Sequence, residues 1–102
     1  MPKKTIYSDP VTLIEPIERG EGDKKQKIKS VKIRKPQSGE LRGLKISQIM
    51  QMDVDTMMVL LPRVTDPALN DADIATLDPE DLTDLSVAVV GFFDTQRKFQ
   101  TV

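Results

Sequence analysis

Polar and apolar residues alternate in two short segments near the start of the chain. Residues 11–17 (VTLIEPI) and 28–35 (IKSVKIRK) are rich in β-branched side chains, and residues 18–27 between them are polar and contain glycine. Such a pattern predicts an antiparallel β-hairpin with a long connection. Because proline cannot donate a hydrogen bond to a neighbouring strand, Pro16 places the first strand at an edge of the sheet.

The second segment has one apolar and one basic face. Val31 and Ile33 share one side of the predicted strand, and Lys32 and Arg34 share the other. Ile28 is out of phase with the apolar pair, which predicts a bulge or a twist where this strand begins. An isolated hairpin is marginally stable in water, so we expect the helices that follow to cover its apolar face.

After the second strand the apolar residues recur at helical intervals. The sequence predicts a short helix over 39–46 with Ser38 as its N-cap. A second helix starts at Asp53 or Asp55. Pro62 removes one backbone hydrogen bond and is expected to bend or end that helix after Leu61. The apolar residues of the second helix follow helical spacing: Val54, Met57, Met58, Leu61 and Val64.

Two further helix starts follow. Asn70 is expected to cap a brief turn. The strongest start signal is Asp78 followed by Pro79, a capping side chain before a proline at the first helical position. This last helix is expected to run to Arg97 or Lys98, because positive charges suit the C-terminus of a helix.

These segments predict an α+β fold, with an N-terminal antiparallel β-hairpin followed by three to four α-helices, the last one longest. Residues 11–98 are expected to form a single domain, with residues 1–10 as a flexible N-terminal arm and residues 99–102 as a tail. Apolar residues make up 38% of the chain and aromatic residues 4%, which is below ordinary globular usage. We therefore expect part of the chain to be disordered or completed by a partner.

The composition excludes several kinds of chemistry. The chain contains no histidine and no cysteine, which rules out cysteine nucleophiles, histidine-based acid–base catalysis and the usual zinc sites within it. The acids do not have the spacing of a calcium-binding loop. We therefore expect no enzymatic activity and no cofactor. The longest apolar run covers only residues 87–90, and the start of the chain lacks an apolar signal segment, which predicts a soluble cytoplasmic protein.

Charge is distributed unevenly along the chain. Residues 1–50 contain twelve Lys or Arg and six acids, a net charge of +6, whereas residues 51–102 contain three and ten, a net charge of −7. This asymmetry favours contacts between the two halves, either within one molecule or between copies in a homo-oligomer, or a partner of mixed charge.

The order of these segments resembles a known family. The strand pair VTLIEPI and IKSVKIRKP, followed by SGELRGL, DVDTMMVLLPRVT and LDPEDLTDLSVAVVGFF, is similar to the small tail-assembly chaperones of Mu-like and related contractile-tailed bacteriophages. The resemblance covers about residues 11–93. It rests on apolar strands, an Arg-Lys-Pro strand exit, a Leu-Leu-Pro-Arg turn and a paired Phe, in that order.

The resemblance implies a function without catalysis. Such chaperones bind the tape-measure protein, a long helical protein that sets tail length, and keep it soluble until the tail tube polymerises around it. Implied further partners are tail-tube subunits and a frameshifted longer form of the same protein. The chain ends nine residues after Phe93, as expected of a short form. The resemblance also implies a location in the host bacterial cytoplasm and absence from the mature virion. The alternative is a structural tail component, such as an adaptor or completion protein.

The candidate partner-binding residues form two groups. Four methionines lie within residues 50–58, and methionine side chains adapt to many apolar shapes, although Met57 and Met58 can equally fill a small core. The last helix is apolar around more than half of its circumference, which is more than a core face requires. The predicted set is Met50, Met52, Met57, Met58, Leu61, Val87, Val90, Phe92 and Phe93.

The basic hairpin offers a rival function, that of a small nucleic-acid-binding protein. Its cations could neutralise phosphates: Lys24, Lys25, Lys27, Lys29, Lys32, Arg34 and Lys35. No aromatic residue alternates with them to stack on bases, so a solvated strand face is the preferred interpretation and no nucleic-acid partner is expected. The acids of the second half are interpreted as helix caps, at Asp78 for example, or as solvated side chains.

Overall fold

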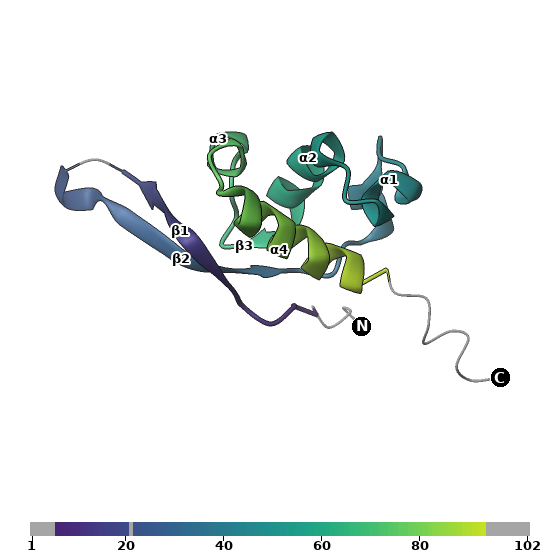
Figure 1. Ribbon diagram of the computed structural model, residues 1–102, viewed down its shortest axis with the longest axis horizontal. Coiled ribbons are helices and arrows are strands. Elements are labelled where there is room, and N and C mark those ends of the chain that lie inside the picture. Colours follow the sequence, from purple (N-terminus) through teal and green to yellow (C-terminus); the bar gives the residue numbers. More distant parts are fainter. Residues whose placement is uncertain (1–5, 21, 94–102) are drawn as a thin grey trace.

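The computed structural model describes residues 6–20 and 22–93 (Figure 1). The helices lie on one side of a small antiparallel sheet, and the hairpin of that sheet extends beyond them. The strands are β1 (Val11–Arg19), β2 (Gln26–Ile33) and β3 (Thr65–Asp66). The helices are the short 3-10 helices η1 (Gly22–Lys24) and η2 (Ser38–Leu41), and the α-helices α1 (Ile46–Met50), α2 (Val54–Val64), α3 (Asp71–Ala75) and α4 (Pro79–Gly91).

The predicted fold class is confirmed. An N-terminal hairpin is followed, within the described residues, by four α-helices, and α4 is the longest of them with 13 residues. The capping residues predicted for three of these helices are also confirmed. Asp53, Asn70 and Asp78 each accept a hydrogen bond from a backbone N–H in the first turn of the helix that follows.

β1 is an edge strand, as Pro16 predicts, and its pairing with β2 is interrupted. Thr12 pairs with Ser30, whereas Ile17 pairs with Ile28, so residues 13–16 stand opposite a single residue of β2. The predicted irregularity therefore exists, but it lies in β1 and not at the entrance of β2. The physical reason is that Pro16 has no N–H to donate, so the ladder breaks around it.

β2 is the central strand of the sheet. On one side it pairs with β3, through Ile33 opposite Thr65, and β3 is too short for any sequence periodicity to predict it. Residues 6–8 are also hydrogen-bonded to the end of β2, since Tyr7 forms a bridge with Arg34 and the Ser8 N–H donates to the Ile33 carbonyl at 2.7 Å. The rest of the predicted arm, residues 1–5, lies outside the described residues.

The core lies between the sheet and the helices. Val31 and Ile33 point into it, as their alternation with basic residues predicts. β1 and the four α-helices supply further buried apolar residues: Leu13, Ile17, Ile49, Met57, Leu60, Leu61, Val64, Ile74, Leu85 and Val89. Leu69 is added from the connection before α3. Helices therefore cover the apolar face of the hairpin, which makes the two-stranded unit stable.

Three predicted helix boundaries are wrong. The segment 39–46 does not form one helix, because η2 ends at Leu41, Gly43 takes a left-handed φ of 83° and α1 begins only at Ile46. The residue that caps η2 is Gln37 and not Ser38. α4 ends at Gly91 with Phe92 as its C-cap, so the predicted helix stops short, and its last residues, 94–98, lie outside the described residues.

α2 continues past Pro62 to Val64, one turn further than predicted. Proline removes one hydrogen bond, but the backbone around it is held by neighbouring elements. The Arg63 carbonyl accepts a hydrogen bond from the Arg34 guanidinium at 2.6 Å, and the Arg63 side chain donates to the Glu40 carbonyl at 2.7 Å. These contacts keep the last turn of α2 helical.

Candidate protein-binding surface

The turn between α1 and α2 presents methionine side chains in a fixed backbone geometry. The Met52 N–H donates to the Ile49 carbonyl at 2.9 Å, and the Asp53 N–H donates to the Gln48 carbonyl at 3.0 Å. This pair of hydrogen bonds is a Schellman motif, in which the residue at the Met52 position takes a left-handed conformation. Met52 does so with a φ of 56°. Glycine is the usual residue there, and a residue with a Cβ costs about 1 kcal/mol.

The same turn fixes the start of α2. The Asp53 carboxylate accepts from the Thr56 N–H at 3.0 Å and from the Thr56 hydroxyl at 2.9 Å. Because Asp53 both closes α1 and caps α2, the residues between the two helices have little freedom. Met52 and Val54 are therefore held at the surface, with 38% and 53% of their side chains exposed.

A groove lies between this turn and α4. It is lined by Gln51, Met52, Val54, Leu82, Thr83 and Ser86 and has a volume of about 180 Å³. Val87 lies four residues after Thr83, on the same side of α4, and is 54% exposed. The groove and Val87 form an accessible apolar strip between two helices. We refer to these seven residues as the groove surface.

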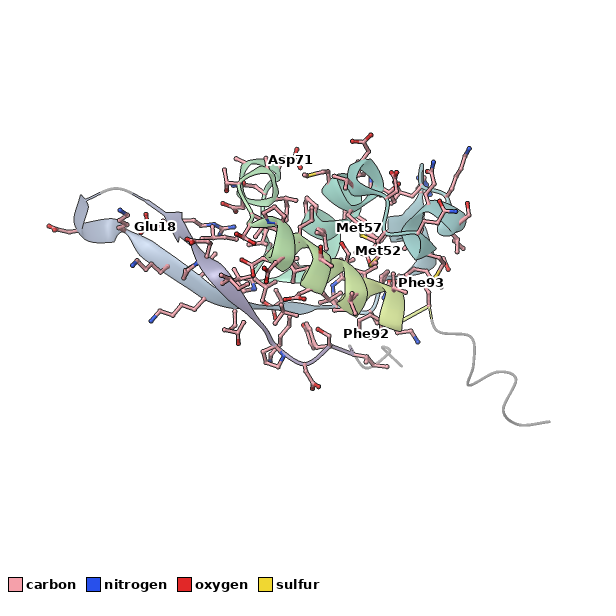
Figure 2. The ribbon with its side chains drawn as sticks, viewed as in Figure 1. Glu18, Met52, Met57, Asp71, Phe92 and Phe93 are labelled. Atoms are coloured by element: carbon pink, nitrogen blue, oxygen red, sulfur yellow. The ribbon has the colours of Figure 1, made fainter. Side chains whose placement is uncertain are left out.

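The structure divides the nine predicted partner-binding residues into three groups. Met50, Met52 and Val87 are exposed. Met58, Val90, Phe92 and Phe93 are partly buried and pack against the core, and the two phenylalanines lie at the end of α4 (Figure 2). Met57 and Leu61 have no exposed surface.

Met57 and Leu61 must therefore be removed from the accessible set. Both lie on the face of α2 that packs into the core, which is the position that their helical spacing with Val64 predicts. For Met57 the structure selects the core interpretation over the partner-binding one. Sequence analysis also missed Val54 and Ile46, which are 53% and 56% exposed, because the pattern assigned apolar residues of short helices to the core.

Two acids that the sequence places among solvated side chains are buried. Asp81 in α4 has no exposed surface, and its carboxylate accepts hydrogen bonds from the N–H groups of Ile14 and Glu15 at 2.7 and 3.1 Å. These are the donors left free where Pro16 interrupts β1. Asp81 therefore replaces the missing strand partner and attaches α4 to the edge of the sheet. A proline inside a strand was the only signal in the sequence that such an acceptor is needed.

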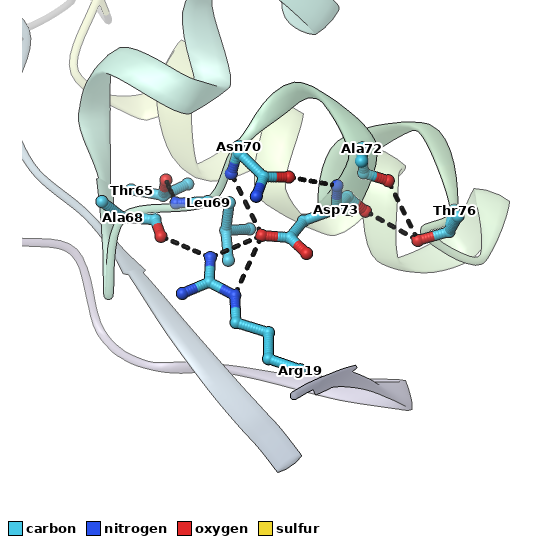
Figure 3. Close-up of polar contacts among 8 residues, drawn as sticks. All are labelled: Arg19, Thr65, Ala68, Leu69, Asn70, Ala72, Asp73 and Thr76. Carbon is cyan, nitrogen blue, oxygen red and sulfur yellow. Dashed lines mark hydrogen bonds and ion pairs between the residues drawn. The ribbon is translucent and has the colours of Figure 1, made fainter. Parts of the chain in front are cut away.

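Asp73 attaches the other end of β1 to α3 (Figure 3). Its carboxylate accepts from Arg19 Nε at 3.1 Å and from the Asn70 N–H at 3.1 Å, and Arg19 also donates to the Ala68 carbonyl at 2.6 Å. Burial alone would raise the pKa of Asp73, but the hydrogen bonds from Arg19 and Asn70 outweigh it, and the pKa is lowered. The spacing of Asn70 and Asp73, three residues apart, is that of a capping box and was the available signal.

Arg34 and Glu40 form a third polar contact between elements, which joins the end of β2 to η2. We refer to the contacts of Asp81, Asp73 and Glu40 as the three joints. Arg34 Nη1 donates to Glu40 Oε1 at 2.7 Å, and the Gln37 N–H donates to the same oxygen at 2.9 Å. The hydrogen bond from Arg34 lowers the pKa of Glu40 against the opposing effect of burial. Arg34 is thus a structural residue and not part of a free basic face.

Comparison with known proteins identifies the family of the chain. The family described as phage tail assembly chaperone proteins, E, or 41 or 14, matches residues 10–94. This chain belongs to that family. The match covers both strands of the hairpin and all four α-helices, and therefore every joint and the whole groove surface described above. It confirms the resemblance found in the sequence.

Two relatives of this chaperone come from Escherichia phage P2. Tail assembly protein E is 39% identical over 82 residues, which are 80% of this chain and 86% of protein E. Tail assembly protein E′ is also 39% identical over 82 residues, which are 55% of its length. The chain thus spans about half the length of E′. No solved structure matches the chaperone.

Family membership identifies the chaperone as a protein without enzymatic activity. Among residues 6–20 and 22–93, no three His, Cys, Asp or Glu side chains come together in a way that could hold a metal ion. No helix within the same residues has the length and apolar character needed to cross a membrane.

The motifs behind the resemblance have structural roles in the chaperone. The Arg-Lys-Pro strand exit supplies Arg34, and the Leu-Leu-Pro-Arg turn supplies Arg63, which meet over Glu40. The basic strand is less free than its composition indicates, because Lys25 and Lys27 lie 3.1 and 3.9 Å from the carboxylate of Glu18. These parts of the motifs thus hold the fold together.

Proposed function

We propose that this tail assembly chaperone binds the tape-measure protein of its phage and shields apolar helical segments of that protein before the tail tube polymerises. Binding is stoichiometric and reversible, and tail-tube subunits displace the chaperone as the tube grows. The proposal places the protein in the host bacterial cytoplasm and outside the mature virion.

The observation that carries this proposal is the set of exposed apolar side chains on the helical side of the molecule. Six large ones are 38–56% exposed: Ile46, Met50, Met52, Val54, Val59 and Val87. Scattered single apolar residues on a surface need no explanation, but here Met52 and Val54 line one groove, and Val87 lies four residues after its lining residue Thr83 on α4. A client with many different apolar helical segments suits a surface that contains flexible methionine side chains.

The test is co-expression of the chaperone with the tape-measure protein encoded by the same phage, followed by affinity capture. We expect soluble client to be recovered with the wild-type chaperone and much less with Val54→Ser/Val87→Ser, which removes two exposed apolar side chains of the groove surface without touching the core. Val59→Ser is the matched control, because Val59 is 44% exposed on α2 but does not line the groove. Variants of Leu61 are unsuitable, because they would unfold the protein.

The experiment also has a result that would reject the proposal. If the tape-measure protein remains insoluble in the presence of folded wild-type chaperone, and no complex is captured, shielding of this client is wrong. Detection of the chain in purified virions would then favour the alternative of a structural tail component.

The proposed partners include further proteins of the tail. The P2 relative E′ contains the same matched region within a longer chain. We propose that a longer form of this chaperone shares the domain and the groove surface, and that both forms act on one client. The unequal charges of the two halves also favour homo-oligomers, which sedimentation of the purified chain would test.

A further inference from the structure

We propose that the groove between the Gln51–Asp53 turn and α4 receives one large apolar side chain of a client helix, and that Lys or Arg residues flank this side chain on the client. The inference rests on the proposed function, since it assumes a helical client, and it specifies the segments that the chaperone selects. Basic amphipathic segments are then bound in preference to acidic ones.

The size of the groove fits one side chain and not a whole helix. Its volume is about 180 Å³, and an apolar cavity of about 150 Å³ is large enough to hold benzene. The lining combines the apolar side chains of Met52, Val54 and Leu82 with the hydroxyls of Thr83 and Ser86. A helix that lies along α4 would insert a Leu, Met or Phe here and place its neighbouring turns over Val87.

Charge determines the chemistry of the flanking residues. In residues 46–93 the sequence has nine acids and a single basic residue, Arg63, which is engaged with the carbonyls of Glu40 and Arg42. Asp55 follows the groove-lining residue Val54 in the sequence, and Glu80 and Asp84 lie beside Thr83 on the surface of α4. All three acids are exposed, and none of them forms an ion pair among the described residues. An apolar groove with an uncompensated acidic rim is complementary to an apolar side chain between cations.

The backbone at Met52 is an independent sign that this side chain serves a purpose other than stability. Its left-handed φ of 56° is a conformation that glycine adopts without strain. Strained positions of this kind persist where the surrounding structure fixes them, as the Schellman motif does here, and they are concentrated at functional sites. The methionine lines the groove from that position, where glycine would leave the wall open.

A second copy of the chain is a weaker candidate for the occupant. The basic part of the molecule is the hairpin, which is a strand pair and not a helix. Two of its lysines, Lys25 and Lys27, are already close to Glu18 in the same hairpin. A basic amphipathic helix meets both requirements of the groove, whereas the hairpin meets only that of charge.

The direct test uses two synthetic peptides and does not depend on the tape-measure protein. Both are alanine-based helices of about 18 residues with one leucine stripe, long enough to be helical in water. One carries lysines beside the stripe and the other carries glutamates at the same positions. Fluorescence anisotropy with the full chain is expected to show binding of the lysine peptide, at least about tenfold tighter than that of the glutamate peptide at low salt.

Variants of the chaperone locate the site. We expect Val87→Ser and Met52→Gly each to weaken binding of the lysine peptide several-fold, and Val59→Ser to leave it unchanged. Asp84→Lys, outside the first turn of α4, is expected to reduce the preference for the lysine peptide. Met52→Gly has a second readout that a merely damaged fold would not give, because its melting temperature should equal or exceed that of the wild type.

The outcomes separate this inference from the proposed function. If the tape-measure protein is kept soluble but the peptides bind equally or not at all, the groove assignment is overturned and the function stands. If the lysine peptide binds through Val87 but the client stays insoluble, the groove assignment is supported and the proposed function fails. If instead the chain dimerises and Val87→Ser abolishes the dimer without peptide binding, the occupant is a second copy and the inference is wrong.

Discussion

The hairpin and the helical region use charge and apolar surface in opposite ways. In β2, exposed cations alternate with apolar residues that point into the core, and β1 exposes one large apolar side chain, Ile14, among polar ones. In the helical region, several acids point inward as joints, while six large apolar side chains point outward. Asp73 and Asp81 are buried, and each accepts hydrogen bonds from N–H groups of β1.

Two buried acids connect the helical region to the hairpin. The two buried acids of the second half bind β1 of the first half, through the Arg19 side chain and through two backbone N–H groups. Of the contacts that the unequal charges favour, the described residues contain one ion pair between the two halves within one molecule, Arg19 with Asp73. Exposed acids of α2 and α4, such as Asp55 and Asp84, form no ion pair among residues 6–20 and 22–93.

The largest effect should distinguish the two methionines of the helical region. Met57→Ala is expected to lower the free energy of unfolding by about 2–5 kcal/mol, because it leaves a cavity at a fully buried position. Met52→Ala should change it by less than about 1 kcal/mol, since that side chain is 38% exposed and alanine retains the left-handed backbone strain. Urea denaturation of the two variants and the wild type measures both values.

Equal losses for the two methionine variants would contradict this division. They would mean that Met52 packs more tightly than its exposure indicates, and that the turn between α1 and α2 is part of the core. The assignment of Met57 to the core would fail separately if Met57→Ala were neutral.

The second effect concerns the joint between the two regions. Asp81→Ala removes the acceptor of two backbone N–H groups of β1 and is expected to cost about 2–4 kcal/mol in unfolding free energy. Asp81→Asn, which retains one oxygen acceptor, should recover part of this loss. Asp84→Ala, three residues further along and exposed, is the control and should be close to neutral.

Hydrogen exchange would show where the joint acts. Amide protection of Ile14 and Glu15 should fall in Asp81→Ala before that of the β2 residues, because the N–H groups of β1 lose their partner directly. A uniform loss of protection throughout the sheet would instead indicate global destabilisation without a local joint.

The sequence predicts those parts of the fold that depend on local signals. The alternation of Val31 and Ile33 with cations identifies β2, and the caps Asp53, Asn70 and Asp78 identify three helix starts, because periodicity and capping are properties of neighbouring residues. β3 and the end of α2 depend on distant contacts. α2 continues through Pro62 because Arg34 and Glu40, more than twenty residues earlier, hold its last turn.

The same distinction applies to the surface. Met50, Met52 and Val87, which the sequence selects as partner-binding candidates, are exposed. The burial of Asp73 and Asp81 has only indirect signals in the sequence, a capping-box spacing and the proline in β1, because an acid in a first helical turn is normally solvated. Only the folded chain brings Asp81 opposite the strand that Pro16 interrupts. Neither the groove nor the left-handed conformation of Met52 has a sequence signal, since both depend on how α1, α2 and α4 pack.

A third test uses pH to weaken the joints that contain ion pairs. Because the pKa values of Glu40 and Asp73 are lowered on folding, their contributions to stability are complete above the ordinary values of 4.5 and 3.8 and are lost as the pH falls through the lower values of the folded state. We expect the free energy of unfolding to decrease progressively below about pH 4.5. Asp73→Asn and Glu40→Gln should each reduce the slope, measured by urea denaturation between neutral and acidic pH. An unchanged slope in both variants would show that other carboxyls cause the acid sensitivity.

The smallest effect is expected in the hairpin, where cations contact acids at the surface. Lys25→Gln/Lys27→Gln removes both partners of Glu18, whose side chain is 46% exposed, and exposed pairs contribute about 0–1 kcal/mol. We therefore expect a change in unfolding free energy below about 0.5 kcal/mol, decreasing further with added salt, and unchanged capture of the tape-measure protein. Arg19→Gln provides the contrast, because its partner Asp73 is only 10% exposed. If the lysine variant were as destabilising as Arg19→Gln, hairpin charges would be structural throughout. If the folded lysine variant instead failed to capture the tape-measure protein, the basic strand would be a binding surface. The assignment of binding to the helical region alone would then be wrong.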